Sequence, residues 1–330
     1  ALSTDGYFST FISNGVSTEL CFIAFSLLTL VIVFAGVKNG IERVSKIMMP
    51  ILVVLSCVIT VYSVTRPGAL EGVKYFLVPN FKNFSWMTVV TAMGQMFYSL
   101  SIAMGILITF GSYTEKEVSI ENSTENVEVF DTAIAIMAGL MIIPAVFAFS
   151  GGNMENLNAG PSLMFITIPK VFDSMGLGTL IGILFFVLVL FAALTSSIAL
   201  TECAVSTFQD ELKWSRHKSV CILGVIMLAL GSLSSLGYGP LASIQIIGMQ
   251  FLDFFDFLTN SVMMPISAIC ICLLVSKVIG VDKIAQEVKS HNNPFKREKI
   301  FNFMIKYVCP IFATIILLSS VANAFGIIKM

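Results

Sequence analysis

Three consecutive hydroxyl side chains lie near the middle of a long apolar stretch. Thr195, Ser196 and Ser197 interrupt the apolar residues that run from Gly178 to Phe208. Na⁺ is a hard cation that prefers oxygen ligands, so hydroxyls and backbone carbonyls can hold it. The alternative is helix packing, in which each hydroxyl bonds to a carbonyl of the preceding turn.

A second apolar stretch, from Gly94 to Tyr113, carries Ser99, Ser101 and Gly105 near its middle. Small residues allow membrane helices to approach one another closely, which is one explanation. The other is a locally unwound helix, whose carbonyls and helix ends coordinate an ion or a charged ligand. Two stretches of this kind in one chain favour an ion pathway.

Acidic residues inside apolar stretches point the same way, because a charge in the membrane is costly and is usually functional. Asp131 has no lysine or arginine within ten residues on either side. An unpaired carboxylate at that position needs a cation, a proton or a partner from elsewhere. Further acids lie within or at the ends of apolar stretches: Glu202, Asp210, Asp253 and Asp256.

The composition indicates the class of protein to which these groups belong. Of the 330 residues 56% are hydrophobic and 12% are charged, and the net charge is −1. A soluble domain carries about 25% charged residues, so the sequence indicates an integral membrane protein. The near-zero charge offers no footprint for nucleic acid. The seven cysteines form no CxxC pair, and the sequence has no nucleotide-binding or nucleophile motif, so neither a transition-metal site nor an enzyme is expected.

Eight apolar segments are long enough to cross a membrane. They run from Glu19 to Val37, Val44 to Val64, Met87 to Tyr113, Ile120 to Phe149, Gly178 to Phe208, Ser219 to Leu236, Phe251 to Ile279 and Phe301 to Phe325. Backbone groups in hydrocarbon need internal partners, and the segments lack strand-like alternation. An all-α helical bundle is therefore predicted.

The positive charges predict the orientation. Of the 19 lysines and arginines, 14 lie in or beside the loops after the first, third, fifth and seventh segments, which are therefore expected to be cytoplasmic. The stretch 281–299 is predicted to be a basic cytoplasmic loop, and the loops 65–86 and 150–177 are expected outside. The first residues then lie outside without a signal peptide. This suggests that an odd number of helices precedes them and that the chain is a fragment.

Several sequence blocks resemble the neurotransmitter:sodium symporter family, in particular its bacterial branch. They are GIERVSKIMMP (Gly40 to Pro50), GQMFYSLSIAMGILITFGSY (Gly94 to Tyr113), AGLMIIPAVFAF (Ala138 to Phe149), FITIPKVF (Phe165 to Phe172), FAALTSSIAL (Phe191 to Leu200) and DFFDFLTNSVMMP (Asp253 to Pro265). The resemblance covers the chain from about Thr18 to Phe325.

The resemblance implies the leucine-transporter fold, with two inverted repeats of five helices and with helices 1 and 6 unwound in the membrane. The eight segments would be helices 4 to 11 of one transmembrane domain spanning 1–330, with helices 1 to 3 missing upstream. It also implies a multi-pass protein of the bacterial inner membrane that couples amino-acid uptake to Na⁺ by alternating access.

Carried over by motif, the unwound part of helix 6 is Ser99 to Gly105. The resemblance assigns substrate contacts to Phe97, Tyr98, Ser99, Ser101, Met104, Ser196 and Leu200. The first sodium site includes Ser99 and Asp131, and the second includes the Ala192 carbonyl with the hydroxyls of Thr195 and Ser196. Met104 stands where the family has an aromatic residue, and its flexible side chain favours large apolar or aromatic amino acids.

Asp131 stands where the family has an asparagine, and Ala135 stands where animal members have a serine that binds chloride. Both differences predict that chloride is not required. No other cofactor is expected. The resemblance assigns the outer gate to Asp256 and the inner gate to Asp210 and Tyr113. The resemblance also matches Gly40 and Pro50 to the Gly-X9-Pro pair of helix 5. Glycine and proline let the inner end of that helix unwind.

Other classes of protein remain to be weighed. An ion channel would be expected to show rings of like charge or repeated filter motifs, and none is visible. A sensor or scaffold that keeps the fold without transport is a second alternative, although the retained Asp131 and Thr195–Ser196 pair speak against it.

Overall fold

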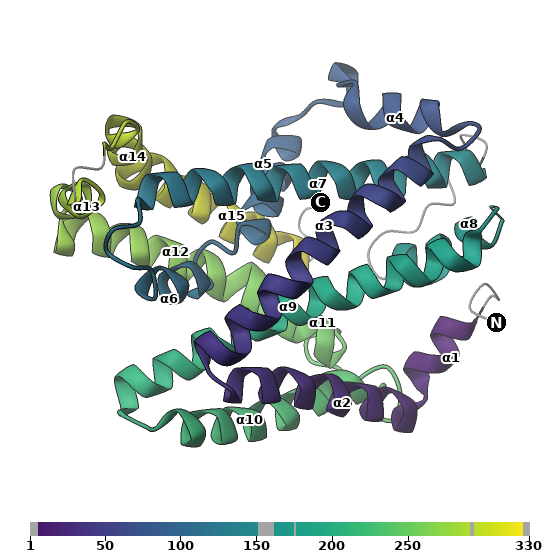
Figure 1. Cartoon of the computed structure of the whole chain (residues 1–330), viewed down its shortest axis with the longest axis horizontal. Helices are drawn as coiled ribbons and strands as arrows, with labels where there is room; N and C mark the ends of the chain where they lie inside the picture. The colour runs from purple at the N-terminus through teal and green to yellow at the C-terminus, as the bar shows by residue number, and fades with distance from the viewer. Residues whose placement is uncertain (1–5, 151–161, 175, 291–293, 326–330) are drawn as a thin grey trace. The chain divides into compact units, whose positions relative to one another are not determined.

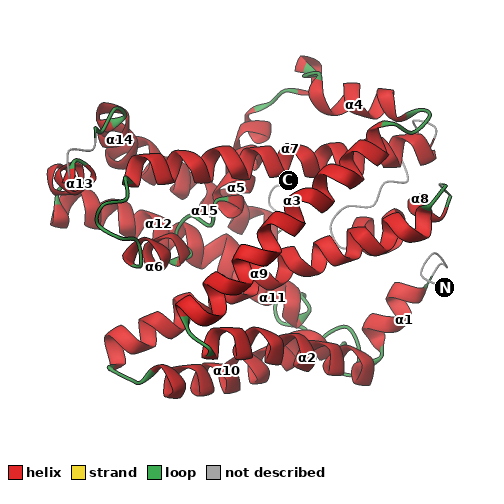
Figure 2. Cartoon of the chain, viewed as in Figure 1, coloured by secondary structure: helices red, strands yellow, loops and turns green. Residues whose placement is uncertain are grey.

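The structure is a computed structural model that describes residues 6–150, 162–174, 176–290 and 294–325. Within these residues every regular element is helical, as Figure 2 shows. The first half holds α1 (Tyr7–Ser13), α2 (Gly15–Phe34), η1 (Val37–Glu42), α3 (Arg43–Val64), α4 (Ala69–Leu77), η2 (Phe81–Asn83), α5 (Trp86–Ser99), α6 (Ile106–Ser112), α7 (Ile120–Ser150), η3 (Leu163–Thr167) and α8 (Ile168–Asp173). The second half holds α9 (Gly178–Leu212), α10 (Arg216–Leu236), α11 (Phe251–Asp256), η4 (Phe257–Met263), α12 (Met264–Leu273), η5 (Leu274–Ile279), α13 (Val281–Val288), α14 (Glu298–Phe303), η7 (Met304–Val308) and α15 (Cys309–Ala324).

In the described part of the chain, seven helical spans are long and apolar enough to cross a membrane. They are Gly15–Phe34, Val37–Val64, Ile120–Ser150, Gly178–Leu212, Arg216–Leu236, Phe251–Ile279 and Glu298–Ala324. These spans match seven of the eight predicted segments. The remaining segment, Met87 to Tyr113, is divided between α5 and α6, because its helix is interrupted where the small and hydroxyl residues lie.

Contacts between the helices group the chain into two compact units. Unit 1 comprises residues 1–82 and 132–245, and unit 2 comprises residues 83–131 and 246–330. Helix α7 contributes its beginning to unit 2 and the remainder to unit 1. The single domain predicted from the sequence stays a prediction.

In unit 1, α2 and α10 lie side by side, and α9 packs against both (Figure 1). Glycine makes the first of these contacts possible. A Cβ at Gly231 would lie 2.1 Å from the ring of Phe22, and one at Gly224 would lie 3.1 Å from Leu30. Small residues at such positions let helix backbones approach closely in a membrane.

The core of unit 1 lies where α3, α7, α8 and α9 meet. Ile59, Ala145, Val171 and Phe185 come one from each of these helices, and each is almost completely buried. The ring of Phe172 meets the ring of Phe185 edge to face, with centroids 5.5 Å apart. This packing fixes the middle of α9, which carries the hydroxyl cluster.

Segments predicted only as connections contain helices. α4 lies within the predicted outer loop 65–86, where a Cβ on Gly72 would come 2.7 Å from the Cα of Pro144 in α7. η3 and α8 lie in the second outer loop, of which 151–161 and 175 fall outside the described residues. α13 lies in the predicted cytoplasmic loop 281–299, of which 291–293 are not described. These helices are short, so few residues carry their pattern.

In unit 2, α12 packs along α15, and α12 also reaches the interrupted segment between α5 and α6. Three π-helical turns, η4, η5 and η7, interrupt the α-helical parts of these two spans. Such turns change the direction in which side chains point, and they are frequent at functional sites.

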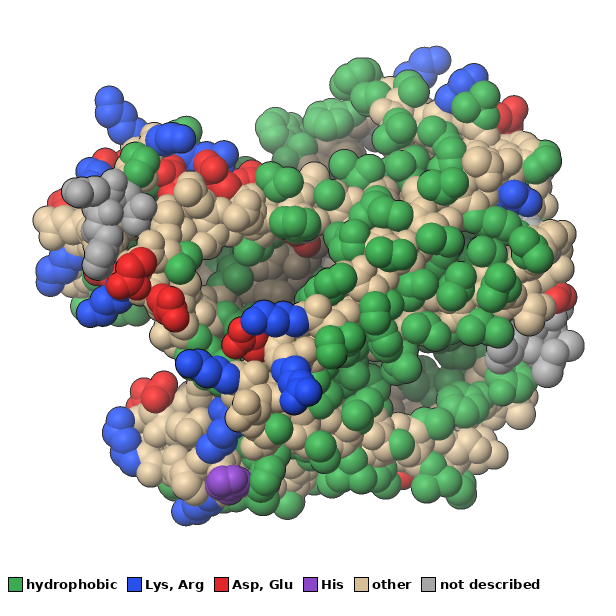
Figure 3. All heavy atoms as spheres, viewed as in Figure 1, with side chains coloured by type: hydrophobic (Ala, Val, Ile, Leu, Met, Phe, Trp, Pro, Cys, Tyr) green, Lys and Arg blue, Asp and Glu red, His purple; other side chains and the backbone are tan. Residues whose placement is uncertain are grey.

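The basic loops meet at one end of each unit. In unit 1, Arg216 at the start of α10 donates to the carbonyl of Val33 at the end of α2, so the first and fifth loops adjoin. Figure 3 shows Lys, Arg and His side chains gathered at this end, beside hydrophobic side chains that cover the flanks of the helices.

In unit 2 the third and seventh loops adjoin. The buried carboxylate of Glu121 accepts the backbone amides of Lys296 and Arg297 at 3.1 and 3.0 Å. The Arg297 side chain pairs with Glu128 at 2.9 Å and with Glu125 at 3.3 Å. The hydrogen bond to Glu128, together with these nearby negative charges, holds the pKa of Arg297 above its ordinary value. Within each unit, the loops predicted to lie on the same side of the membrane therefore adjoin.

Candidate functional site

The interrupted segment between α5 and α6 has an unusual backbone. Ser101, Ala103 and Gly105 have φ angles of 53°, 63° and 79°. The left-handed region costs a residue with a Cβ about 1–2 kcal/mol, and such strain gathers at functional sites. Ser267 of α12 donates its hydroxyl to the Ala103 carbonyl at 3.2 Å, which helps to hold this conformation.

Asp131 lies beside the end of α5. The hydroxyl of Ser99, the last residue of α5, donates to Oδ1 of Asp131 at 2.8 Å. In the sequence this carboxylate had no evident partner nearby. In unit 2 its partner is Ser99, one of the small and hydroxyl residues of the interrupted segment. A hydroxyl that donates its proton keeps lone pairs for a cation, and the negative end of the α5 dipole favours positive charge nearby. The arrangement therefore offers oxygen donors of the kind that Na⁺ prefers.

The other predicted substrate residues of unit 2 lie around the same interruption. Tyr98 is 50% exposed, whereas Phe97, Ser101 and Met104 are half-buried. Phe97 and Ser101 line an apolar cavity that also touches α12 and α15, and Met104 does not line it.

In unit 1 the hydroxyls of the α9 cluster make different contacts. Thr195 donates to the carbonyls of Phe191 and Ala192, each at 3.0 Å. The Ser197 hydroxyl lies 3.1 Å from that of Thr29, so it joins α9 to α2. Helix packing therefore explains Ser197. Back-bonding accounts for the proton of Thr195, and its oxygen lone pairs remain available to a cation.

The predicted residues of α9 share one face of the helix. Ala192, Ser196 and Leu200 follow one another at intervals of four. Ser196 is exposed and Leu200 is 49% exposed, whereas Leu194 and Ile198 on the opposite side are buried. On this face Ala192 packs against the core of unit 1, whereas Ser196 and Leu200 are left exposed.

The predicted gate acids are accessible. Asp256 is exposed, and its Oδ1 accepts the side-chain amide of Asn260 at 2.6 Å. Asp210 is exposed near the end of α9. Tyr113 is the residue that caps the C-terminus of α6, and its ring meets that of Phe110 edge to face.

Gly40 and Pro50 lie on one continuous span formed by η1 and α3. Gly40 is buried within the π-helical η1, where a Cβ would lie only 2.1 Å from the carbonyl oxygen of Ile32. Pro50 lies inside α3, where it removes one backbone hydrogen bond. The N-terminal half of this span therefore combines a buried glycine, a π-helical turn and a proline, each of which departs from a regular α-helix.

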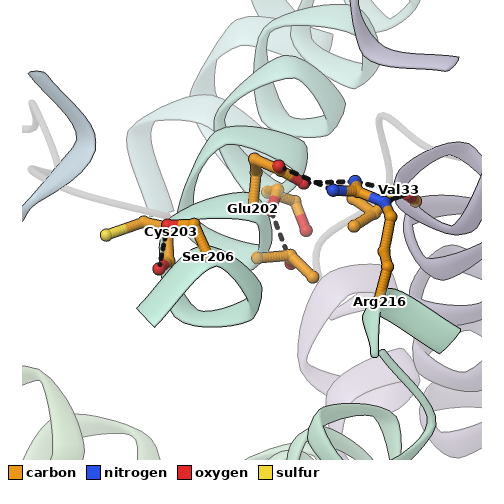
Figure 4. A network of polar contacts seen from close by, with 7 residues as sticks. Val33, Glu202, Cys203, Ser206 and Arg216 are labelled. Atoms are coloured by element: carbon orange, nitrogen blue, oxygen red, sulfur yellow. Dashed lines mark hydrogen bonds and ion pairs between the residues drawn. The ribbon is translucent and has the colours of Figure 1, made fainter. Parts of the chain in front are cut away.

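Glu202 takes part in an ion pair that sequence analysis did not find. Its carboxylate is completely buried and accepts both terminal nitrogens of Arg216, at 2.9 and 2.5 Å (Figure 4). Arg216 also donates from Nε and Nη2 to the Val33 carbonyl at 3.1 and 2.7 Å. The available signal was an arginine placed directly after the short α9–α10 connection, which returns the chain toward Glu202.

Comparisons with known proteins agree with these observations. The sodium:neurotransmitter symporter family matches residues 9–327. The chain belongs to this family. It is 33% identical over 323 residues to the uncharacterised sodium-dependent transporter YhdH of Bacillus subtilis, covering 98% of this chain and 70% of that protein. It is 31% identical to an uncharacterised sodium-dependent transporter of Haemophilus influenzae, covering 90% of this chain and 64% of that protein.

The crystal structure of MhsT in complex with L-phenylalanine matches with a TM-score of 0.82 and 36% identity, covering 96% of this chain and 70% of that chain. Together with the seven described spans, this match confirms the predicted leucine-transporter-like helical fold and a multi-pass membrane location. The family is one of sodium symporters rather than enzymes.

Proposed function

We propose that the gene product containing this chain is a sodium-coupled amino-acid symporter that works by alternating access and prefers large apolar or aromatic amino acids. The observation that carries the proposal is the hydrogen bond between Ser99 and Asp131 at the interrupted segment. It brings a carboxylate and a hydroxyl together beside a helix end, and these are the oxygen donors that a dehydrated Na⁺ requires.

The face of α9 formed by Ala192, Ser196 and Leu200 supports a second sodium site and part of a substrate pocket. Large substrates are favoured by Met104, whose unbranched side chain adapts to bulky ligands. The relative MhsT has been crystallised with L-phenylalanine, which is a ligand of that class.

Uptake into proteoliposomes that contain the full gene product tests the proposal. We expect saturable accumulation of labelled L-phenylalanine with Na⁺ outside, and its loss when choline replaces Na⁺. Unlabelled leucine and tryptophan should compete, whereas glycine and glutamate should not.

Each alternative predicts a different result. A channel would carry current without saturable amino-acid accumulation, and a sensor or scaffold would bind without transport. Sodium-dependent uptake that glycine blocks as well as phenylalanine does would retain the symporter and reject the preference for large side chains.

A further inference from the structure

The carboxylate of Glu121 lies at the start of α7, and this residue is 8% exposed. Its two oxygens accept consecutive backbone amides: Oε2 accepts that of Lys296 at 3.1 Å, and Oε1 accepts that of Arg297 at 3.0 Å. These amides come directly before α14, so α14 lies beside the start of α7 (Figure 1). The carboxylate therefore joins α7 to the beginning of the membrane span Glu298–Ala324.

Both the charge and the two oxygens of Glu121 suit this position. Hydrogen bonds to a charged group are stronger than those between neutral groups, and a carboxylate is favoured at the positive end of a helix. A glutamine has the same size, but it offers one acceptor oxygen, and its amino group would face an N–H group. Glu125 and Glu128 pair with the side chain of Arg297 instead. Their side chains are 37% and 57% exposed, and such exposed ion pairs contribute little.

An uninterrupted stretch of helix connects Glu121 to Asp131. Asp131 follows ten residues further along the chain, which is about 15 Å of helix at about 1.5 Å per residue. This part of α7 is α-helical throughout, and the proline of the helix, Pro144, lies beyond Asp131. Of residues 120–131, Glu121 is the one that is buried. A shift of α7 at Glu121 would therefore be carried along the helix to Asp131.

We propose that Glu121 is a positioning residue that keeps Asp131 within reach of Ser99 by anchoring the start of α7. The inference rests on the proposed sodium site at this pair. The hydrogen bond between Ser99 and Asp131 measures 2.8 Å, so a shift of α7 by a fraction of a helical turn breaks it. Without the anchor, the two oxygen donors are together for a smaller fraction of the time, and the affinity of the site for Na⁺ falls.

Sodium titration of initial uptake rates tests the proposal in proteoliposomes that contain the full gene product. Glu121→Gln keeps the size of the side chain and removes its charge. We expect the Na⁺ concentration for half-maximal uptake of labelled L-phenylalanine to rise roughly fivefold or more, which is a usual size for coupling between separate sites. The maximal rate at saturating Na⁺ should change little. A purely structural defect would instead reduce the amount of folded protein and hence the maximal rate.

Glu125→Gln is the matched control, because it makes the same chemical replacement one turn further along α7. Glu125 contacts the Arg297 side chain at 3.3 Å in an exposed pair, which water and salt screen. The change should leave the half-maximal Na⁺ concentration unchanged. Glu121→Asp is a second variant if Glu121→Gln fails to fold, as gel filtration would reveal. It keeps the charge but shortens the side chain by one methylene, so it should shift the Na⁺ concentration in the same direction by a smaller factor.

Amide hydrogen exchange tests the anchor in the absence of Na⁺. In choline, Glu121→Gln should speed exchange at residues 99–105, beside Asp131, and Glu125→Gln should not. An unmodified protein without sodium-dependent uptake would refute the proposed function, and the exchange measurement would then decide on the anchor alone. Unchanged sodium dependence in the folded Glu121→Gln variant, an equal shift in Glu125→Gln, or unchanged exchange at residues 99–105 would overturn the proposal.

Discussion

At the scale of single residues, Asp131 is the negative charge that the proposed coupling ion, Na⁺, would neutralise. A carboxylate at this depth is unfavourable unless it is neutralised, and the neutral hydroxyl of Ser99 cannot supply positive charge. A bound Na⁺ can. Ala135, one turn along α7, has no oxygen to offer a chloride ion, so Asp131 itself is expected to provide the negative charge.

Asp131→Asn should therefore lower uptake and weaken the apparent affinity for Na⁺ by roughly tenfold or more, because it keeps an oxygen but removes the charge. Sodium titration of initial uptake rates measures this. In the unmodified protein, replacement of chloride by gluconate should have no effect. Combining Asp131→Asn with Ala135→Ser should introduce some dependence on chloride. A chloride requirement in the unmodified protein would show that Asp131 has a different role.

The hydroxyl cluster of α9 offers an internal control for the second sodium site. Thr195→Val and Ser196→Ala each remove one proposed ligand, so both should raise the sodium concentration for half-maximal uptake sharply, because a dehydrated cation is left short of oxygen. Ser197→Ala removes the neighbouring hydroxyl, which contacts Thr29, and should leave that concentration unchanged. Equal effects of all three changes would contradict the assignment.

At the scale of elements, the end of α2 is held by a charged group from α10. Because Glu202 is fully buried, Arg216→Met should take away the arginine that pairs with a buried carboxylate and lower stability by up to about 3–5 kcal/mol. Thermal unfolding of the purified protein in detergent measures the loss. Adding Glu202→Leu should restore much of the stability, because the buried charge is then gone. A double variant no more stable than Arg216→Met would show that the Val33 contact dominates.

The π-helical start of the η1–α3 span gives a second prediction at this scale. Gly40→Ala places a methyl group against the Ile32 carbonyl and should cost about 1–3 kcal/mol through overpacking, with a lower unfolding temperature. Gly94→Ala is the matched control. Gly94 lies inside α5 with nothing within 4 Å of an added Cβ, so the change should be neutral or stabilising by up to about 1 kcal/mol. Equal destabilisation would remove the case for a close approach at Gly40.

At the scale of the whole molecule, the distribution of charge predicts which loops face the cytoplasm. Gln286→Cys, in the basic stretch 281–299, should react with a membrane-impermeant maleimide only after the cells are opened. Asn80→Cys, in the loop between the second and third predicted segments, should react in intact cells. Both positions are exposed, so burial does not decide the result. The reverse pattern would invert the orientation inferred from the lysines and arginines.

The class of fold and the principal elements could be predicted from the sequence. Long apolar segments must be helices in hydrocarbon, and this local requirement does not depend on their neighbours, so seven spans were found close to their observed ends. For the interruption after Ser99, the small and hydroxyl residues left helix packing and local unwinding open, and the resemblance to the family placed the unwound part there. Short helices such as α4 and α13 were missed because few residues carry their pattern.

Tertiary structure decided how individual side chains are used. Thr195, Ser196 and Ser197 look alike in the sequence, yet packing of α9 against α2 assigns Ser197 to Thr29 and leaves Ser196 exposed. Glu202 and Asp131 both read as membrane acids. One proves to be paired with Arg216, and the other meets the hydroxyl of Ser99. Partners in space are set by the rotation and packing of helices far apart in the chain, and a one-dimensional pattern carries little record of them.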